Sequence, residues 1–174
     1  MARLKDAAQR PWEVGSAELL RSMTFAFGFR VTPQQLKKAL IQANLEVYRT
    51  LGDEIVLADR PRENLILDSG VRVRTPLNGT FRLRLVVRAE QSAFSGDEPE
   101  RLFERARELS VSAVEHGFCE LGTQVTPMKD PADPERTLDT FYEVIYTREA
   151  ATLDEACAEA RFALTLEKSA AANR

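Results

Sequence analysis

The stretch Val71-Arg72-Val73-Arg74-Thr75, followed by Phe81-Arg82-Leu83-Arg84-Leu85, decides the fold. In both segments apolar and polar side chains alternate, which is the period of a β-strand with one buried face. Asn78-Gly79 lies between them and is the dipeptide most typical of a hairpin turn. The stretch therefore predicts an antiparallel hairpin with one apolar face and one face of arginines.

The side chains also predict the register of this hairpin. A two-residue turn at 78–79 would place an arginine opposite a leucine and mix the two faces. A three-residue loop over 77–79, with Gly79 left-handed, pairs Val73 with Leu83 and keeps one face apolar, so we expect a bulged hairpin. The arginines then face each other in two pairs, Arg74 with Arg82 and Arg72 with Arg84.

Toward the C-terminus the sequence predicts a helix, two further strands and a final helix. The first helix starts after Asp97, which can cap it, and ends at Gly117. Thr152-Leu153-Asp154-Glu155 is a capping box that opens the last helix. The expected ranges are 99–116 for the first helix, 118–126 and 137–147 for the strands, 127–136 for a loop with three prolines, and 152 onward for the last helix.

From Val71 onward the order is therefore strand, strand, helix, strand, strand, helix. Helices on one face of a mainly antiparallel sheet form an α+β sandwich, and a ferredoxin-like variant is the most economical arrangement of these elements. We expect this domain to cover residues 71–174, and a helical arm with a loop to cover residues 1–70.

Within that arm the sequence predicts two helices. The first, over 16–28, has its apolar residues at helical spacing. Thr32-Pro33-Gln34-Gln35 is a capping box with proline at the first helical position, and the second helix runs from there to a stop at Gly52. The two helices are expected to form an αα-hairpin. A short strand at 53–57 and a loop over 58–70 complete the arm.

The composition excludes several classes of protein. Of the 174 residues, 44% are hydrophobic and 29% are charged, which is typical of a globular domain and not of a membrane or disordered protein. The net charge of -3 argues against nucleic-acid binding driven by overall charge. Cys119 and Cys157 suit two reduced, buried thiols rather than a disulfide framework or a metal site.

The expected location is the cytoplasm, or a virion assembled there. The first residues of the sequence lack the apolar core of a signal peptide. No apolar run approaches the ~20 residues that span a bilayer. We therefore expect no membrane partner.

The sequence holds no motif of a catalytic centre, a cofactor site or a metal site. The single histidine, His116, lies in the last turn of a predicted helix, where the helix dipole favours a cation. Asp130, Asp133, Glu135 and Asp139 form an acidic loop, but their spacing is not that of an EF-hand, so we interpret them as solvated loop charge. We expect no catalytic, cofactor-binding or metal-binding residues.

The four arginines of the hairpin are the exception. In the expected register Arg72, Arg74, Arg82 and Arg84 share one sheet face, and directly opposed like charges cost free energy. Two interpretations remain open: a solvated face neutralised by nearby acids, or a docking face for an acidic partner, either another subunit or a phosphate backbone. Nucleic acid would favour aromatic side chains on that face, whereas Phe81 points the other way, so a protein partner is favoured. The complementary acidic surface is formed by Asp130, Asp133 and Glu135.

Residues 81–147 resemble the strand–helix–strand–strand plan of tail-terminator and neck proteins of tailed bacteriophages. The matching segments are Phe81–Ala89, Arg101–Gly117, Val125–Pro127 and Thr140–Thr147. Separately, residues 31–41 resemble the helical start of phage head-completion and connector proteins. The N-terminal αα-hairpin and the last helix depart from this plan. The resemblance implies a ring-forming structural protein at the junction of head and tail, without catalytic residues.

Two functions are expected on these grounds. The first is a non-enzymatic structural protein that assembles into a homo-oligomeric ring and contacts neighbouring assembly proteins. The alternative is a small-ligand-binding or regulatory module of a bacterial cytosol. Such a module needs an apolar cleft with a few convergent polar groups, and toward it the sequence offers only Tyr142 and Tyr146.

Overall fold

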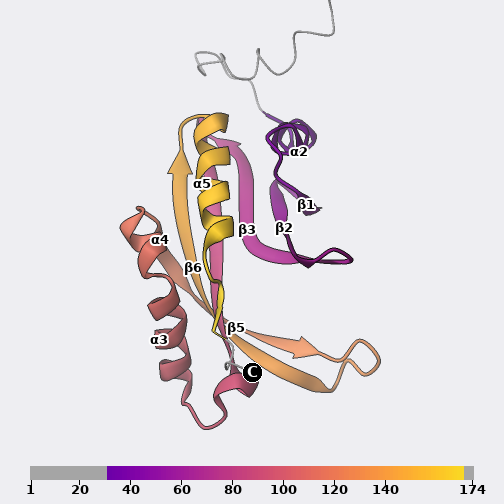
Figure 1. Cartoon of the computed structure of the whole chain (residues 1–174), viewed down its shortest axis with the longest axis vertical. Coiled ribbons are helices and arrows are strands. Elements are labelled where there is room, and N and C mark those ends of the chain that lie inside the picture. Colours follow the sequence, from indigo (N-terminus) through magenta and orange to yellow (C-terminus); the bar gives the residue numbers. More distant parts are fainter. Residues whose placement is uncertain (1–30, 171–174) are drawn as a thin grey trace, which may run out of the picture.

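The computed structural model describes residues 31–170, so the helix expected over 16–28 lies outside the described residues. An antiparallel sheet of six strands in the order β1-β2-β3-β4-β6-β5 runs through the described chain, and a short seventh strand, β7, pairs with β4 in parallel (Figure 1). The strands are β1 Val47–Leu51, β2 Glu54–Arg62, β3 Leu65–Leu77, β4 Thr80–Glu90, β5 Cys119–Lys129, β6 Thr137–Ala150 and β7 Ser169–Ala170.

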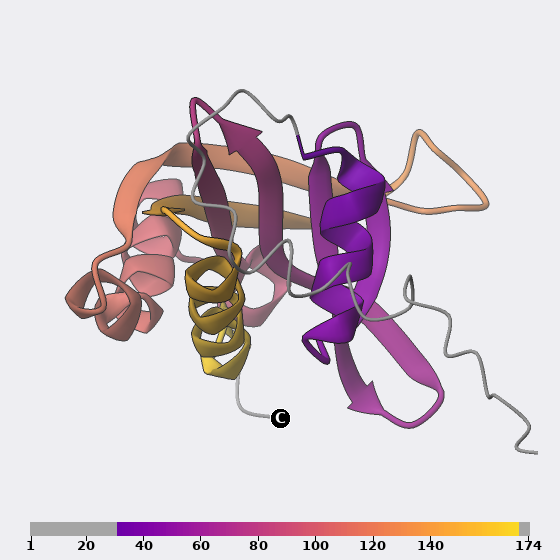
Figure 2. The same cartoon turned by 90° about the horizontal axis from the view of Figure 1, so that it is seen from above.

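The helices pack against the apolar face of this sheet. They are α2 Pro33–Gln42, α3 Pro99–Leu109, α4 Val111–Glu115 and α5 Leu153–Thr165, with a 3-10 helix, η1, at Gln91–Phe94. Figure 2 shows α2 and α5 on the same side of the strands. The apolar core lies between these helices and the alternate side chains of β4, which are Phe81, Leu83, Leu85, Val87 and Ala89.

The central hairpin has the predicted register. Val73 lies opposite Leu83, and the arginines face each other in the two expected pairs. The turn was predicted wrongly, because Leu77 pairs with Thr80 and the loop holds only two residues, Asn78 and Gly79, with φ of 54° and 87°. The extra residue lies instead in a bulge of β3 between Arg74 and Leu77. Pro76 falls inside this bulge, where its missing N–H disturbs the ladder least.

The predicted helical arm is wrong beyond residue 42. The capping box is present, with Thr32 and Gln35 each accepting from the other's backbone N–H, but α2 ends at Gln42 and Asn44 then takes a φ of 59°. Val47, which continues the helical spacing of apolar residues, belongs to β1. The segment 58–70, expected as a loop, forms parts of β2 and β3. Pairing with neighbouring strands overrides the local helical period here.

The ferredoxin-like arrangement is therefore also wrong. The sheet starts with four consecutive antiparallel strands, β1 to β4, where a helical arm and only two strands were expected. Gly70, the expected boundary between the helical arm and the sheet domain, lies inside β3. Strands from both sides of that position are hydrogen-bonded in one sheet, since β2 pairs with β3 on either side of it.

Several boundaries in the second half of the chain also differ from expectation. The helix expected over 99–116 breaks at Ser110, whose hydroxyl donates to the carbonyl of Ala106 at 2.7 Å. Asp97 does not cap this helix but pairs with Arg105 at 2.7 Å. At α5, Thr152 accepts from the N–H of Glu155, whose carboxylate accepts from Ala151 instead of closing the box.

The ends of the other predicted elements shift as well. β5 continues to Lys129, so the loop that follows spans only 130–136. Both cysteines are free; Cys157 is buried as expected, whereas Cys119 is exposed.

Gly70 marks the point at which β3 leaves β4. It has a φ of +75°, and a Cβ at this position would lie 2.7 Å from the carbonyl oxygen of Val86. The pairing of β3 with β4 ends at Val71, and the far end of β4 pairs with β7 instead. The distal part of the β2–β3 hairpin therefore projects from the sheet as a two-stranded ribbon (Figure 1).

We expect Gly70→Ala to destabilise the protein by about 3 kcal/mol or more, because the methyl group meets backbone and the left-handed φ is retained. Gly52→Ala is the matched control, since Gly52 also has a positive φ, +59°, but nothing lies within 4 Å of its would-be Cβ. The control should cost about 1 kcal/mol. Urea unfolding of both variants tests this, and equal losses would show that the close approach to Val86 has no energetic consequence.

Candidate functional site

The arginine face lies on the side of the sheet opposite the helices. It consists of Arg72 and Arg74 on β3 and Arg82 and Arg84 on β4. Their neighbours along each strand, such as Val73 and Leu83, are buried in the core. The structure thus brings together all four arginines that the sequence singled out.

Three of these arginines have a carboxylate of the same chain nearby. Arg74 Nε lies 2.6 Å from Asp53 Oδ2, and an Arg82 guanidinium nitrogen lies 3.2 Å from a Glu149 oxygen. Arg72 is farther from its acid, at 3.7 Å from Glu54. The first two pairs are largely exposed, and exposed pairs contribute only about 0–1 kcal/mol each. A hollow of about 210 Å³ is lined by Arg74, Arg82 and the hairpin turn.

Arg84 differs from the other three. Within the described part of the chain it makes no ion pair. It lies directly opposite Arg72, and the Nε atoms of both arginines are buried without a hydrogen-bond partner. This pair is therefore the part of the face whose positive charge and donors are least satisfied.

The predicted acidic residues lie in the loop between β5 and β6. Asp130 accepts from the N–H of Ala132 at 2.9 Å and lies 3.6 Å from Arg136, and Asp133 accepts from the N–H of Glu135 at 3.2 Å. These two carboxylates thus shape the turn. The exposed Glu135 side chain makes no such contact within the described chain. Across residues 31–170 no group of acids, histidines or cysteines is placed to hold a metal ion.

The structure does not bring the acidic loop to the arginine face. Arg82 pairs with Glu149 near one end of β6, whereas the loop precedes Thr137 at the other end. At about 3.3 Å per residue, these two ends are roughly 40 Å apart along the strand. Figure 1 shows the β5–β6 hairpin extending away from the helices, with the loop at its tip.

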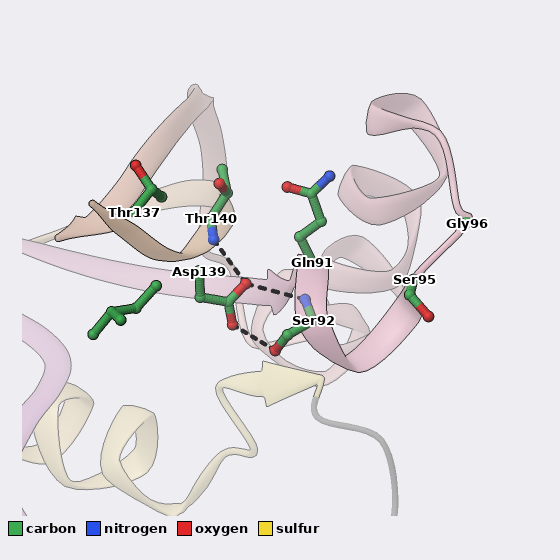
Figure 3. Close-up of a pocket in the computed structure, with 8 residues that line it drawn as sticks. Gln91, Ser92, Ser95, Gly96, Thr137, Asp139 and Thr140 are labelled. Atoms are coloured by element: carbon green, nitrogen blue, oxygen red, sulfur yellow. Dashed lines mark hydrogen bonds between the residues drawn. The ribbon is translucent and has the colours of Figure 1, made fainter. Parts of the chain in front are cut away.

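Asp139 anchors η1 to β6 (Figure 3). Its carboxylate accepts from the N–H and hydroxyl of Ser92, at 3.0 and 2.6 Å, and from the N–H of Thr140 at 2.7 Å. The adjoining hollow of about 410 Å³ is lined by polar residues, among them Gln91 and Ser95, and by Leu138. The sequence predicts only loop charge at Asp139 and no role for Ser92, because their contact joins residues far apart in the chain.

The hydrogen bonds to Asp139 also affect its titration. Burial raises the pKa of Asp139, but the donors Ser92 and Thr140 outweigh burial, so the pKa lies below its ordinary value. A carboxyl with a lowered folded-state pKa contributes stability above its unfolded pKa of about 3.9, and that contribution is lost as the pH falls through the folded value.

His116 belongs to a second cluster that the sequence did not reveal. Its ring stacks on Phe162 with the centroids 3.6 Å apart, and its Nε2 lies 3.0 Å from Glu159 Oε2. The other oxygen of the buried Glu159 lies 2.8 Å from Arg148. The cluster thus links α4, α5 and β6, and His116, the residue that ends α4, also joins that helix to α5.

The two tyrosines considered for a ligand cleft are both buried. Tyr142 packs edge-on against Phe103 with the ring centroids 5.4 Å apart, and Tyr146 is 2% exposed in the main core. A further hollow of about 460 Å³ has Gln42, Asn44, Asp154 and Arg161 among its lining residues. Polar residues thus supply most of the side chains that line these two hollows, together with Leu138 in the first and Ala43 and Cys157 in the second.

We expect Asp139→Asn to destabilise the protein by about 1 kcal/mol at neutral pH, because the neutral amide is a weaker acceptor for three donors. The difference from wild type should shrink below about pH 4, because the unfolded wild-type chain then gains a proton at Asp139 that the folded chain, with its lowered pKa, still resists. Urea unfolding at pH 7 and at pH 3.5 measures both differences. Asp133→Asn serves as the control, with a smaller loss at pH 7, and an unchanged gap at low pH would contradict the assigned role.

Comparison with known proteins does not place the chain in a family. The chain matches no known protein family, no curated protein and no solved structure.

Proposed function

We propose that this chain is a non-enzymatic assembly protein that forms a homo-oligomer, in a ring of the kind found at the head–tail junction or tail terminator of a tailed phage. The observation that carries the proposal is the separation of two complementary surfaces on one protomer. The arginine face lies near one end of β6 and the acidic hairpin tip at the other. Neither surface can satisfy the other within the same chain.

This arrangement fits a head-to-tail contact. When two different patches of a protomer are complementary, each copy can offer its tip to one neighbour and its arginine face to the other. Such a heterologous contact closes into a ring if the rotation between copies permits. Complementary charges also steer association and fix its register.

The β5–β6 hairpin carries apolar side chains that support an interface. Four of them are between 40% and 64% exposed: Leu121, Val125, Met128 and Leu138. Each square ångström of apolar surface removed from water contributes about 25 cal/mol. Burial of these side chains against another subunit would add to the attraction between the charges.

The alternative of a small-ligand-binding module has less support. It would require an apolar cleft with a few converging polar groups. The hollows beside Asp139 and Arg161 are lined mainly by polar residues, and neither contains Tyr142 or Tyr146, which are both buried in packing contacts. The proposed location remains a virion or the cytoplasm, and among the described residues no helix has the length and apolar character to span a membrane.

The proposal predicts self-association that weakens with salt. Wild-type protein should form a species larger than a monomer in sedimentation velocity at low ionic strength. Raising the salt from about 0.05 to 0.5 M should shift it toward monomer, because screening shortens the range of the charge contacts. A monomer at every concentration and in both salts would overturn the proposal.

Removing two arginines should weaken this assembly without unfolding the protomer. Arg74→Thr with Arg82→Thr loses two exposed ion pairs and relieves one like-charge contact, so stability should change by less than about 1 kcal/mol. Lys37→Gln with Lys38→Gln removes the same charge from exposed positions on α2 and should assemble like wild type. Sedimentation of both variants beside urea unfolding makes the comparison, and equal assembly of the two would exclude Arg74 and Arg82 from the contact.

A further inference from the structure

Arg72 and Arg84 form a site with more hydrogen-bond donors than acceptors. The two residues are directly paired across β3 and β4. Each has an Nε that is buried and lacks a hydrogen-bond partner. A buried donor without an acceptor costs free energy, and two opposed guanidinium groups repel each other. A negatively charged hydrogen-bond acceptor at this site would therefore satisfy the free donors and offset the repulsion.

The acids around this pair do not fill that need. Glu54 is 3.7 Å from a terminal nitrogen of Arg72 and does not reach either Nε. Asp53 and Glu149 are engaged with Arg74 and Arg82. The nearby hydroxyl of Thr147 donates to the backbone carbonyl of Leu83 at 3.0 Å. None of these neighbours therefore supplies an acceptor to the Nε of Arg72 or Arg84.

A carboxylate has the chemistry that the site requires. Its two oxygens match the fork of nitrogens of a guanidinium, and such charge-assisted bonds are shorter and stronger than neutral ones. One carboxylate between two arginines offers an oxygen to each and removes their mutual repulsion. A side chain on a protruding tip can reach a half-buried pair on a neighbouring surface.

Glu135 is the acid of the β5–β6 loop that suits the role. Asp130 and Asp133 use their oxygens to hold the turn, whereas the side chain of Glu135 is exposed at the tip and makes no hydrogen bond or ion pair within the described chain. We infer that Arg72 and Arg84 form a carboxylate-receiving site, and that its ligand is Glu135 of a second copy of this chain. The inference rests on the proposed self-assembly and names the contact that produces it.

Charge reversal on full-length chains tests this pairing. Arg84→Glu and Glu135→Arg should each weaken self-association at least about tenfold, because each places like charges at the contact. The chain that carries both substitutions should return to within about threefold of wild type, since every contact then holds the reversed pair. Arg84→Glu combined with Asp133→Arg is the matched control and should not recover. Sedimentation equilibrium measures the association, and circular dichroism melting confirms that each variant folds.

The outcomes separate this inference from the proposed function. If wild type assembles and the single reversals assemble equally well, the pairing is wrong while self-assembly stands. If wild type stays monomeric, both fail. If Arg84→Glu does not fold, Arg84→Gln replaces it, and undiminished assembly of that variant counts against the site. Inorganic phosphate that stabilises wild type but not Arg84→Gln, with no effect of Glu135→Arg on assembly, would assign the site to a small oxyanion instead.

Discussion

Along β4 the side chains of Phe81, Leu83, Leu85, Val87 and Ala89 all point into the core, so the residues between them must point to the other side of the sheet. This alternation fixes the positions of the helices, which cover the apolar side. It also fixes the opposite face, where β3 repeats the pattern with arginines. Because a shift of one residue would exchange the two faces, the core and the arginine face are set by the same register.

That register is also the part of the structure that the sequence predicts well. Strict alternation in two neighbouring segments leaves one pairing that keeps the apolar residues together, and the observed pairs agree with it. The turn was missed because an extra residue anywhere along the hairpin restores the apolar pairing, and here it lies in the bulge between Arg74 and Leu77 rather than in the loop. The alternation of apolar and polar side chains shows that one extra residue is needed, but it does not show where along the hairpin that residue lies.

The remaining differences come from contacts between distant parts of the chain. Apolar residues from Leu36 to Val47 fit a helical period. Val47 nevertheless pairs with Leu57 in the β1–β2 hairpin, which the local sequence pattern does not predict. The same limit applies to the candidate site. The four arginines and the acidic loop could be predicted, but the orphaned Nε atoms of Arg72 and Arg84 depend on which acids the fold places beside them. The cluster of His116, Glu159 and Arg148 likewise joins three separate elements.

The length of β6 has a consequence for how such a protein can diversify. In a ring held by the hairpin tip of one copy and the arginine face of the next, the length of β6 sets the distance between the two contact points of each protomer. That distance in turn sets the size of the ring. Adding two residues to each strand in the outer part of the β5–β6 hairpin would lengthen that spacing by about 7 Å without entering the core. Odd insertions would turn the tip over, so only even ones preserve the direction in which it binds.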